Sequence, residues 1–161
     1  MLNPEFLKNG PGPRLAFIDK PDPKLIAETL VSFANTEGGT LVVGLKENGD
    51  PSGKIENEAL SKAIKEADAL CSPSVVTGSW EPVETEKGAT VYALRVPRSI
   101  ELHALSDGRV LIRSDVVNRP LGGQEILKLA SAKSTGDYES EPVPGATKED
   151  FSRKMIDEYL A

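Results

Sequence analysis

A double glycine between two apolar segments constrains this chain more than any other feature. The stretch FANTEGGTLVVGL begins at Phe33, and its glycines, Gly38 and Gly39, follow a helical pattern and precede a run of β-branched residues. A dinucleotide-binding turn has the opposite order, because there the amino end of a helix must face the phosphate. The carboxyl end of a helix is electronegative and often needs a left-handed residue to reverse the chain. We therefore interpret the two glycines as a structural turn rather than a phosphate cradle.

The periodicity around this turn predicts an α+β domain with a mixed β-sheet covered by helices. Asp22 is placed to cap a helix that Pro23 opens and the double glycine closes. The unbroken apolar run from Thr40 is typical of a strand covered on both faces. The other expected elements are a strand from 14, a helix over 58–71, antiparallel strands within 74–83 and 89–97, a strand over 109–114 and a helix within 122–133.

Composition divides the chain into one domain and three flanking parts. A chain of 161 residues with 39% hydrophobic residues can bury one core, which we place in residues 14–133. The sequence NGPGP makes residues 1–13 a flexible lead-in, and the acidic, proline-bearing residues 134–146 are expected to form an extended linker. Residues 147–161 predict a helix that docks on this domain, on a second copy or on a following domain, through an apolar stripe of Phe151, Met155, Ile156 and Tyr159.

The charge of the chain is unevenly placed. The net charge of −6 argues against a protein that coats nucleic acid, but three basic and seven acidic residues follow Lys133, so the domain itself is nearly neutral. Five arginines fall within residues 95–119. We expect Arg109 and Arg113 to project from one face of a strand and Arg119 to lie in the loop beyond, where the three could contact phosphates. Acidic residues are interleaved with them, so an ordinary solvated surface is the alternative.

The sequence offers no catalytic group, metal site or cofactor motif. His103 is the only histidine, no catalytic triad can be assembled around it, and the carboxylates are scattered rather than clustered at ligand spacing. Cys71 is the only cysteine, and its place in an apolar stripe favours a buried residue without chemistry. No segment has the length of a membrane span or the pattern of a signal peptide, so we expect a cytoplasmic protein without a membrane partner.

Two blocks of the chain resemble a known family. The first, LIAETLVSFANTEGGTLVVGLKENGDPSG, resembles the signature of the AlbA_2, or Schlafen-type, domain, in which a helix ends at an asparagine before a double glycine and an apolar strand. Asn35 is that asparagine, and it joins Gly38 and Gly39 in the structural turn. The second, DGRVLIRSDVVNRPLGGQEILKL, resembles the family's closing segment and has Arg113 and Arg119 at the matched basic positions. Together the blocks cover most of residues 14–133.

This resemblance implies a DNA-binding module of a bacterial transcriptional regulator, with nucleic acid as its partner. Longer bacterial members continue into further domains, often described as ATP-binding, so a downstream domain of that kind is implied. A homo-oligomer formed through the C-terminal helix is a further expectation, and with it a role as an oligomerisation or relay domain.

A rival implication is metal-dependent ribonuclease activity, because some eukaryotic relatives cleave RNA with an acidic triad. This chain has Ala16-Phe17-Ile18 where the family commonly has glutamate, phenylalanine and lysine, and it has Lys46 before Glu47 where an acidic residue usually follows the glycine-bearing strand. Without clustered carboxylates a two-metal site cannot hold its ions. The sequence therefore argues against an enzyme.

Overall fold

The chain forms an α+β fold in a computed structural model that describes residues 4–140. The first of its two units is 1–130, and the elements below lie within it except for the end of α3. Within the described residues, no helix combines the length and the apolar character that crossing a bilayer requires. The elements are η1 (Pro4–Asn9), β1 (Leu15–Ile18), α1 (Pro23–Asn35), β2 (Gly39–Val43), α2 (Asn57–Ala69), β3 (Cys71–Ser72), β4 (Glu81–Glu84), β5 (Thr90–Val96), β6 (Ala104–Leu105), β7 (Leu111–Ser114), β8 (Val117–Pro120) and α3 (Gly123–Ser140).

A mixed four-stranded sheet in the order β1-β2-β5-β4 forms the centre of the first unit. Strand β1 runs parallel to β2, whereas β5 is antiparallel to both β2 and β4. Leu41, Val42 and Val43 of β2 are fully buried although their side chains alternate between the two faces. The prediction of a mixed sheet with a strand covered on both faces is therefore confirmed.

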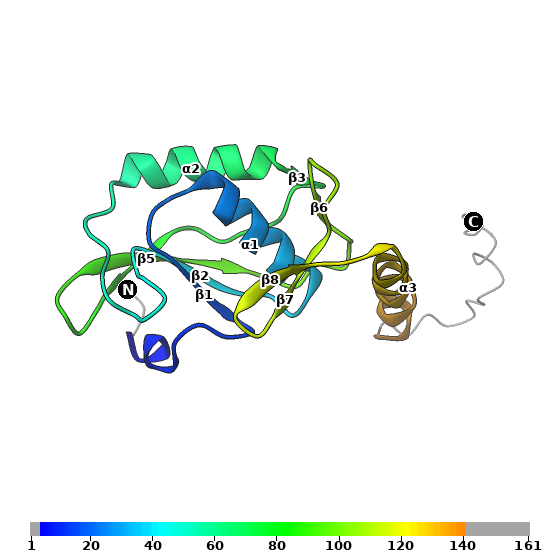
Figure 1. Ribbon diagram of the computed structural model, residues 1–161, viewed down its shortest axis with the longest axis horizontal. Coiled ribbons are helices and arrows are strands. Elements are labelled where there is room, and N and C mark those ends of the chain that lie inside the picture. Colours follow the sequence, from blue (N-terminus) through cyan, green and yellow to red (C-terminus); the bar gives the residue numbers. More distant parts are fainter. Residues whose placement is uncertain (1–3, 141–161) are drawn as a thin grey trace. The chain divides into compact units, whose positions relative to one another are not determined.

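Helices α1 and α2 cover one face of this sheet (Figure 1). The Asp22 carboxylate accepts a hydrogen bond from the Lys24 amide, and Pro23 occupies the first helical turn, so the predicted start of α1 is confirmed. The apolar stripe of α1 packs on the inward residues of β2 and β5, and its largest buried side chain is Phe33. Thus α1 is held by tertiary packing along most of its length.

The short 3₁₀ helix η1 lies against the opposite face of the sheet (Figure 1). Phe6 and Leu7 pack there with Leu15 and Phe17 on a second apolar cluster that includes Val42. The structure therefore differs from the expected flexible lead-in, because residues 4–9 form part of the fold. The sequence signal was the glycine- and proline-rich run after residue 8, and it says nothing about the apolar pair before it.

The end of the domain also differs from expectation. Helix α3 ends at Ser140, so residues 134–140 are helical where an extended linker is predicted. The first proline after Pro120 is Pro142, and a single glycine at 136 costs a helix only about 1 kcal/mol, so nothing in this stretch forbids helix. Residues 141–146 and the predicted helix over 147–161 lie outside the described residues.

The double glycine reverses the chain between α1 and β2. Gly38 has a φ of +77°, and its amide donates to the Phe33 carbonyl oxygen at 2.8 Å. A β-carbon at Gly38 would stand 2.7 Å from the Val96 carbonyl oxygen, and one at Gly39 would stand 2.7 Å from the Phe33 ring. Both glycines are thus required by close backbone approach, and the Gly38 amide is used within the turn rather than left open to an anion.

Gly38→Ala should lower the free energy of unfolding by about 2–4 kcal/mol, because it combines left-handed strain with a clash against β5. Gly88→Ala is the matched control, since Gly88 has a φ of +83° but no atom within 4 Å of its β-carbon position. Its cost should be about 1 kcal/mol. Urea denaturation of both variants measures the difference, and equal losses would contradict the clash.

Candidate nucleic-acid interface

The three arginines expected to bind phosphates do not share a face. Strands β7 and β8 form a hairpin in which Arg113 pairs with Asn118 and Ile112 pairs with Arg119. Because successive side chains of a strand point to opposite faces, Arg113 and Arg119 lie on opposite faces of the hairpin. Arg109 precedes β7, and Arg119 lies within β8 rather than in a loop. The hairpin register therefore separates the side chains that the sequence pattern grouped.

Arg113 is an interior residue with 7% exposure. Its guanidinium donates to the carbonyl oxygens of Gly12 at 3.0 Å and Leu15 at 2.9 Å, and to the Asn118 side-chain oxygen at 3.0 Å. Its central carbon lies 5.4 Å from the centroid of the Phe33 ring. Burial lowers the pKa of Arg113, and the nearby Asp115 partly opposes that effect. This guanidinium ties β1, the hairpin and α1 together, which is a structural role.

Arg109 and Arg119 are closer to solvent, and both are ion-paired. Arg109 contacts Asp107 at 2.9 Å and Glu28 at 3.1 Å, and these hydrogen bonds raise its pKa. Arg119 lies 3.3 Å from Glu125, a carboxylate whose pKa is lowered first by the Gly122 amide and then by Arg119. Paired guanidiniums present less net positive charge to an incoming phosphate than free ones do.

Asn35 is the side chain that joins the end of α1 to the rest of the domain. Its exposure is 3%, and its amide nitrogen donates to the carbonyl oxygens of His103 and Leu111, each at 2.9 Å. Its side-chain oxygen accepts from the His103 amide at 2.9 Å. The neighbouring Thr36 hydroxyl accepts from the Arg113 amide at 3.0 Å. The signature around the double glycine thus links α1 to β7 and to the segment before β6.

The two residues with the most reactive side-chain types are buried in structural positions. The His103 ring nitrogens lie 2.9 Å from the Pro73 carbonyl oxygen and 2.8 Å from the Ser99 hydroxyl. Cys71 is buried at the start of β3, two residues beyond the end of α2, and burial together with Asp68 raises the pKa of its thiol to about 11. At neutral pH the thiol is therefore protonated and a poor nucleophile.

A hollow on the β1 side of the domain holds the residues that bear on ribonuclease chemistry. Asp19, Lys46 and Glu47 line it, with Phe17 and Arg113 among the other residues. Among residues 4–140, no group of three or more histidine, cysteine, aspartate or glutamate side chains is arranged to hold a metal ion. The lining of this hollow includes two carboxylates, those of Asp19 and Glu47, where the acidic triad implied by the family resemblance needs three.

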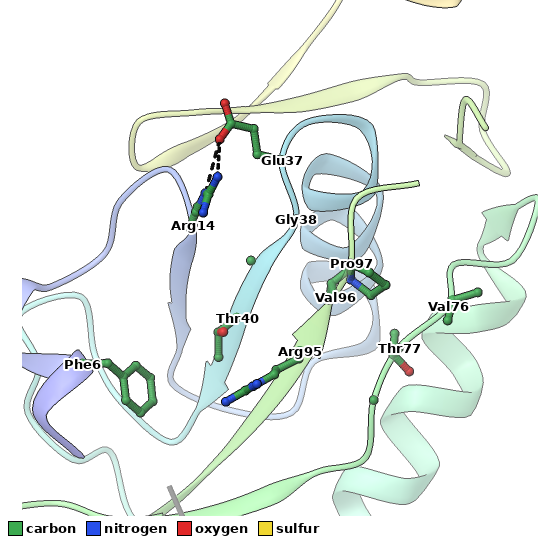
Figure 2. A pocket seen from close by; sticks show the side chains of 12 residues that line it. Phe6, Arg14, Glu37, Gly38, Thr40, Val76, Thr77, Arg95, Val96 and Pro97 are labelled. Atoms are coloured by element: carbon green, nitrogen blue, oxygen red, sulfur yellow. Dashed lines mark hydrogen bonds and ion pairs between the residues drawn. The ribbon is translucent and has the colours of Figure 1, made fainter. Parts of the chain in front are cut away.

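A broader groove of about 870 Å³ lies beside the double glycine. Four stretches distant in sequence form it: η1 with the residue before β1, the turn into β2, the loop between β3 and β4, and the end of β5 (Figure 2). Its walls include the apolar side chains of Phe6, Val76 and Pro97. Arg14, Arg95, Thr40 and Thr77 add two guanidiniums and two hydroxyls.

The two guanidiniums of this groove differ in their pairing. Arg14 contacts Glu37 at 2.7 Å, whereas the exposed Arg95 side chain has no hydrogen-bond or ion-pair partner within the part of the chain that the structure describes. In Figure 2 Arg95 projects from β5 toward Thr40 and the Phe6 ring. The register places Arg95 opposite Thr40, on the face of the sheet that η1 partly covers.

Arg14, Arg95 and Phe6 are far apart in the sequence, so the sequence pattern does not group them. Alternation within β5 was a usable signal, since an arginine between the apolar Leu94 and Val96 must point away from the helix-covered face. The approach of Phe6 was not predictable, because it depends on η1 packing against strands that follow it by many residues.

Comparison with known families gives a match along most of the domain. Residues 14–122 match the family model described as Schlafen, AlbA_2. No curated protein matches the chain.

One solved structure that resembles the chain is the crystal structure of the DIP2311 protein from Corynebacterium diphtheriae. The two share 17% sequence identity with a TM-score of 0.57. The match covers 75% of this chain and 24% of that protein, so the chain spans about a quarter of the solved protein's length. At this identity the likeness shows a shared fold.

Arg113→Lys should lower the free energy of unfolding by about 2–4 kcal/mol, because an ammonium cannot reproduce three guanidinium hydrogen bonds in a buried position. Arg119→Lys is the matched control on the exposed face of the same hairpin and should change stability by no more than about 0.5 kcal/mol. Chemical denaturation measures both. A stable Arg113→Lys protein would contradict the structural role.

Proposed function

The chain belongs to the Schlafen AlbA_2 family, and we propose that its described domain is a nucleic-acid-binding module that contacts phosphate through Arg95 in the groove beside the double glycine. Domains of this family are often found in candidate DNA-binding regulators. A place in a bacterial transcriptional regulator, with DNA as the partner, is part of the same proposal.

The observation that carries the proposal is the Arg95 guanidinium, which lies on an open groove without a partner among the described residues. An arginine that is free of intramolecular partners can offer its planar set of donors to a phosphate without first breaking an ion pair. Arg109 and Arg119 would have to give up carboxylates, and Arg113 would have to leave the core. We therefore assign the main contact to Arg95, with Arg14 beside it.

The net charge of −6 limits how strong this contact can be. Each phosphate that a protein neutralises adds to the salt dependence of binding, and a groove with two arginines engages few phosphates. Binding should therefore be weak at moderate salt and stronger at low salt.

Arg95→Glu should weaken binding of fluorescently labelled oligonucleotides at least about tenfold at low salt, because it places a carboxylate where the phosphate is bound. Fluorescence anisotropy titrations with DNA and RNA, single-stranded and duplex, provide the measurement.

Lys62→Glu is the control, because it makes the same charge change at an exposed position of α2, on the opposite side of the sheet from η1. It should change affinity by less than about twofold if the contact is local rather than a long-range charge effect. The proposal fails if the unaltered protein binds none of the oligonucleotides at low salt, or if the two variants weaken binding equally.

A further inference from the structure

We propose that the groove is a subsite for an unpaired nucleotide, with the base stacked on Phe6 and the adjoining phosphate at Arg95, so that the domain prefers single-stranded nucleic acid to duplex. This rests on the proposed function and adds the form of nucleic acid that is recognised.

The apolar wall of the groove is the first reason. Phe6, Val76 and Pro97 line it, and Val76 is 73% exposed. A duplex presents phosphates, sugars and base edges to a protein, so its apolar contacts are limited mainly to thymine methyl groups and sugar faces. A base that has left the stack presents a flat apolar face, which proteins bind by stacking it on aromatic side chains.

The size and openness of the groove are the second reason. About 870 Å³ lies within the range of pockets that hold small organic ligands, and it can receive a base with its sugar. The groove also lies on the surface rather than within a closed cavity, so a chain of nucleotides can enter and continue beyond it. A single-stranded segment therefore fits better than an isolated buried ligand.

The arrangement of polar groups is the third reason. Figure 2 shows the Phe6 ring and the Arg95 side chain pointing toward each other from η1 and β5, with Thr40 on the strand between those two elements. A nucleotide has the same arrangement, with a planar base at one end and a phosphate at the other. The Thr40 and Thr77 hydroxyls can donate to or accept from the sugar and phosphate oxygens between them.

The small number of cations is the fourth reason. A protein that makes roughly six to ten phosphate contacts with duplex DNA gains a large part of its affinity from them. Here the groove has two arginines, and Arg14 already contacts Glu37 at 2.7 Å. Because phosphate contacts of this number supply little affinity, stacking on Phe6 must contribute a large share of it.

The test compares short oligothymidylate and oligouridylate with a mixed-sequence duplex of equal length, each titrated with the full chain. The unaltered protein should bind at least one single strand more tightly than the duplex, by about tenfold or more. Phe6→Ala should weaken single-strand binding by about fivefold to a hundredfold, the range expected for loss of one stacked base, and should leave duplex binding unchanged. Phe6→Trp should retain single-strand binding.

Leu7→Ala is the matched control, because Leu7 lies on η1 and packs on the same apolar cluster as Phe6 but does not line the groove. It should affect stability much as Phe6→Ala does and leave binding within about twofold, so a loss seen only at Phe6 reports on the ligand. Salt titrations separate the two contacts. Arg95→Gln should reduce the slope of log affinity against log salt by about 0.7, whereas Phe6→Ala should leave that slope unchanged.

The outcomes distinguish this inference from the proposed function. Equal affinity for duplex and single strands, or single-strand binding that survives Phe6→Ala, overturns the nucleotide subsite while Arg95-dependent binding still supports the nucleic-acid module. Absence of all binding at low salt overturns both. Preferential single-strand binding that Phe6→Ala and Leu7→Ala weaken equally also overturns the subsite, because it indicates a loss of folding rather than of stacking.

Discussion

The buried carboxamide of Asn35 is the contact on which the rest of this domain depends. Its three hydrogen bonds join the last residue of α1 to the backbone of His103 and Leu111, which are 68 and 76 residues away in sequence. Losing them would leave two carbonyl oxygens and an amide unsatisfied in the core, each at a cost of about 1–3 kcal/mol. With α1 fixed at this end, the double glycine can turn directly into β2, and β7 lies where its backbone can reach Thr36. The residues that identify the family therefore specify its architecture, and the two glycines among them also line the groove.

Local sequence chemistry predicted those parts of the fold whose causes are local. The Asp22 cap, the proline that opens α1, the glycines that end it and the apolar run of β2 each depend on residues within one or two turns of chain. The role of Arg113 could not be predicted in this way, because its guanidinium binds carbonyl oxygens 98 and 101 residues away. An arginine in a strand pattern indicates a solvent-facing cation by default, and only the hairpin register shows that this one faces inward.

The difference between local and long-range causes also explains why the candidate site was only partly predicted. Arg109, Arg113 and Arg119 are close together in the chain, so the sequence suggests a common site. The register of the hairpin decides which face each side chain is on, and it puts Arg113 and Arg119 on opposite faces. The groove instead combines Arg14 and Arg95, which β1 and β5 bring to either side of β2. Phe6 completes it from a segment whose only sequence signal was an apolar pair before a flexible-looking run.

Some arginines of this domain are buried and structural and others are exposed, and this division limits how the domain could bind nucleic acid. The guanidinium in the core holds β1 and the hairpin together and adds no accessible charge, and those at the hairpin surface are neutralised by nearby carboxylates. What remains in the groove is one cation without a partner among the described residues, beside an aromatic ring and apolar walls. A surface of that composition cannot hold a polyanion through charge alone. It can bind the base of a single nucleotide through the aromatic ring and its phosphate through the guanidinium. The groove of this domain is therefore suited to the low-charge recognition proposed above, in which affinity depends on exposing a base rather than on following a duplex backbone.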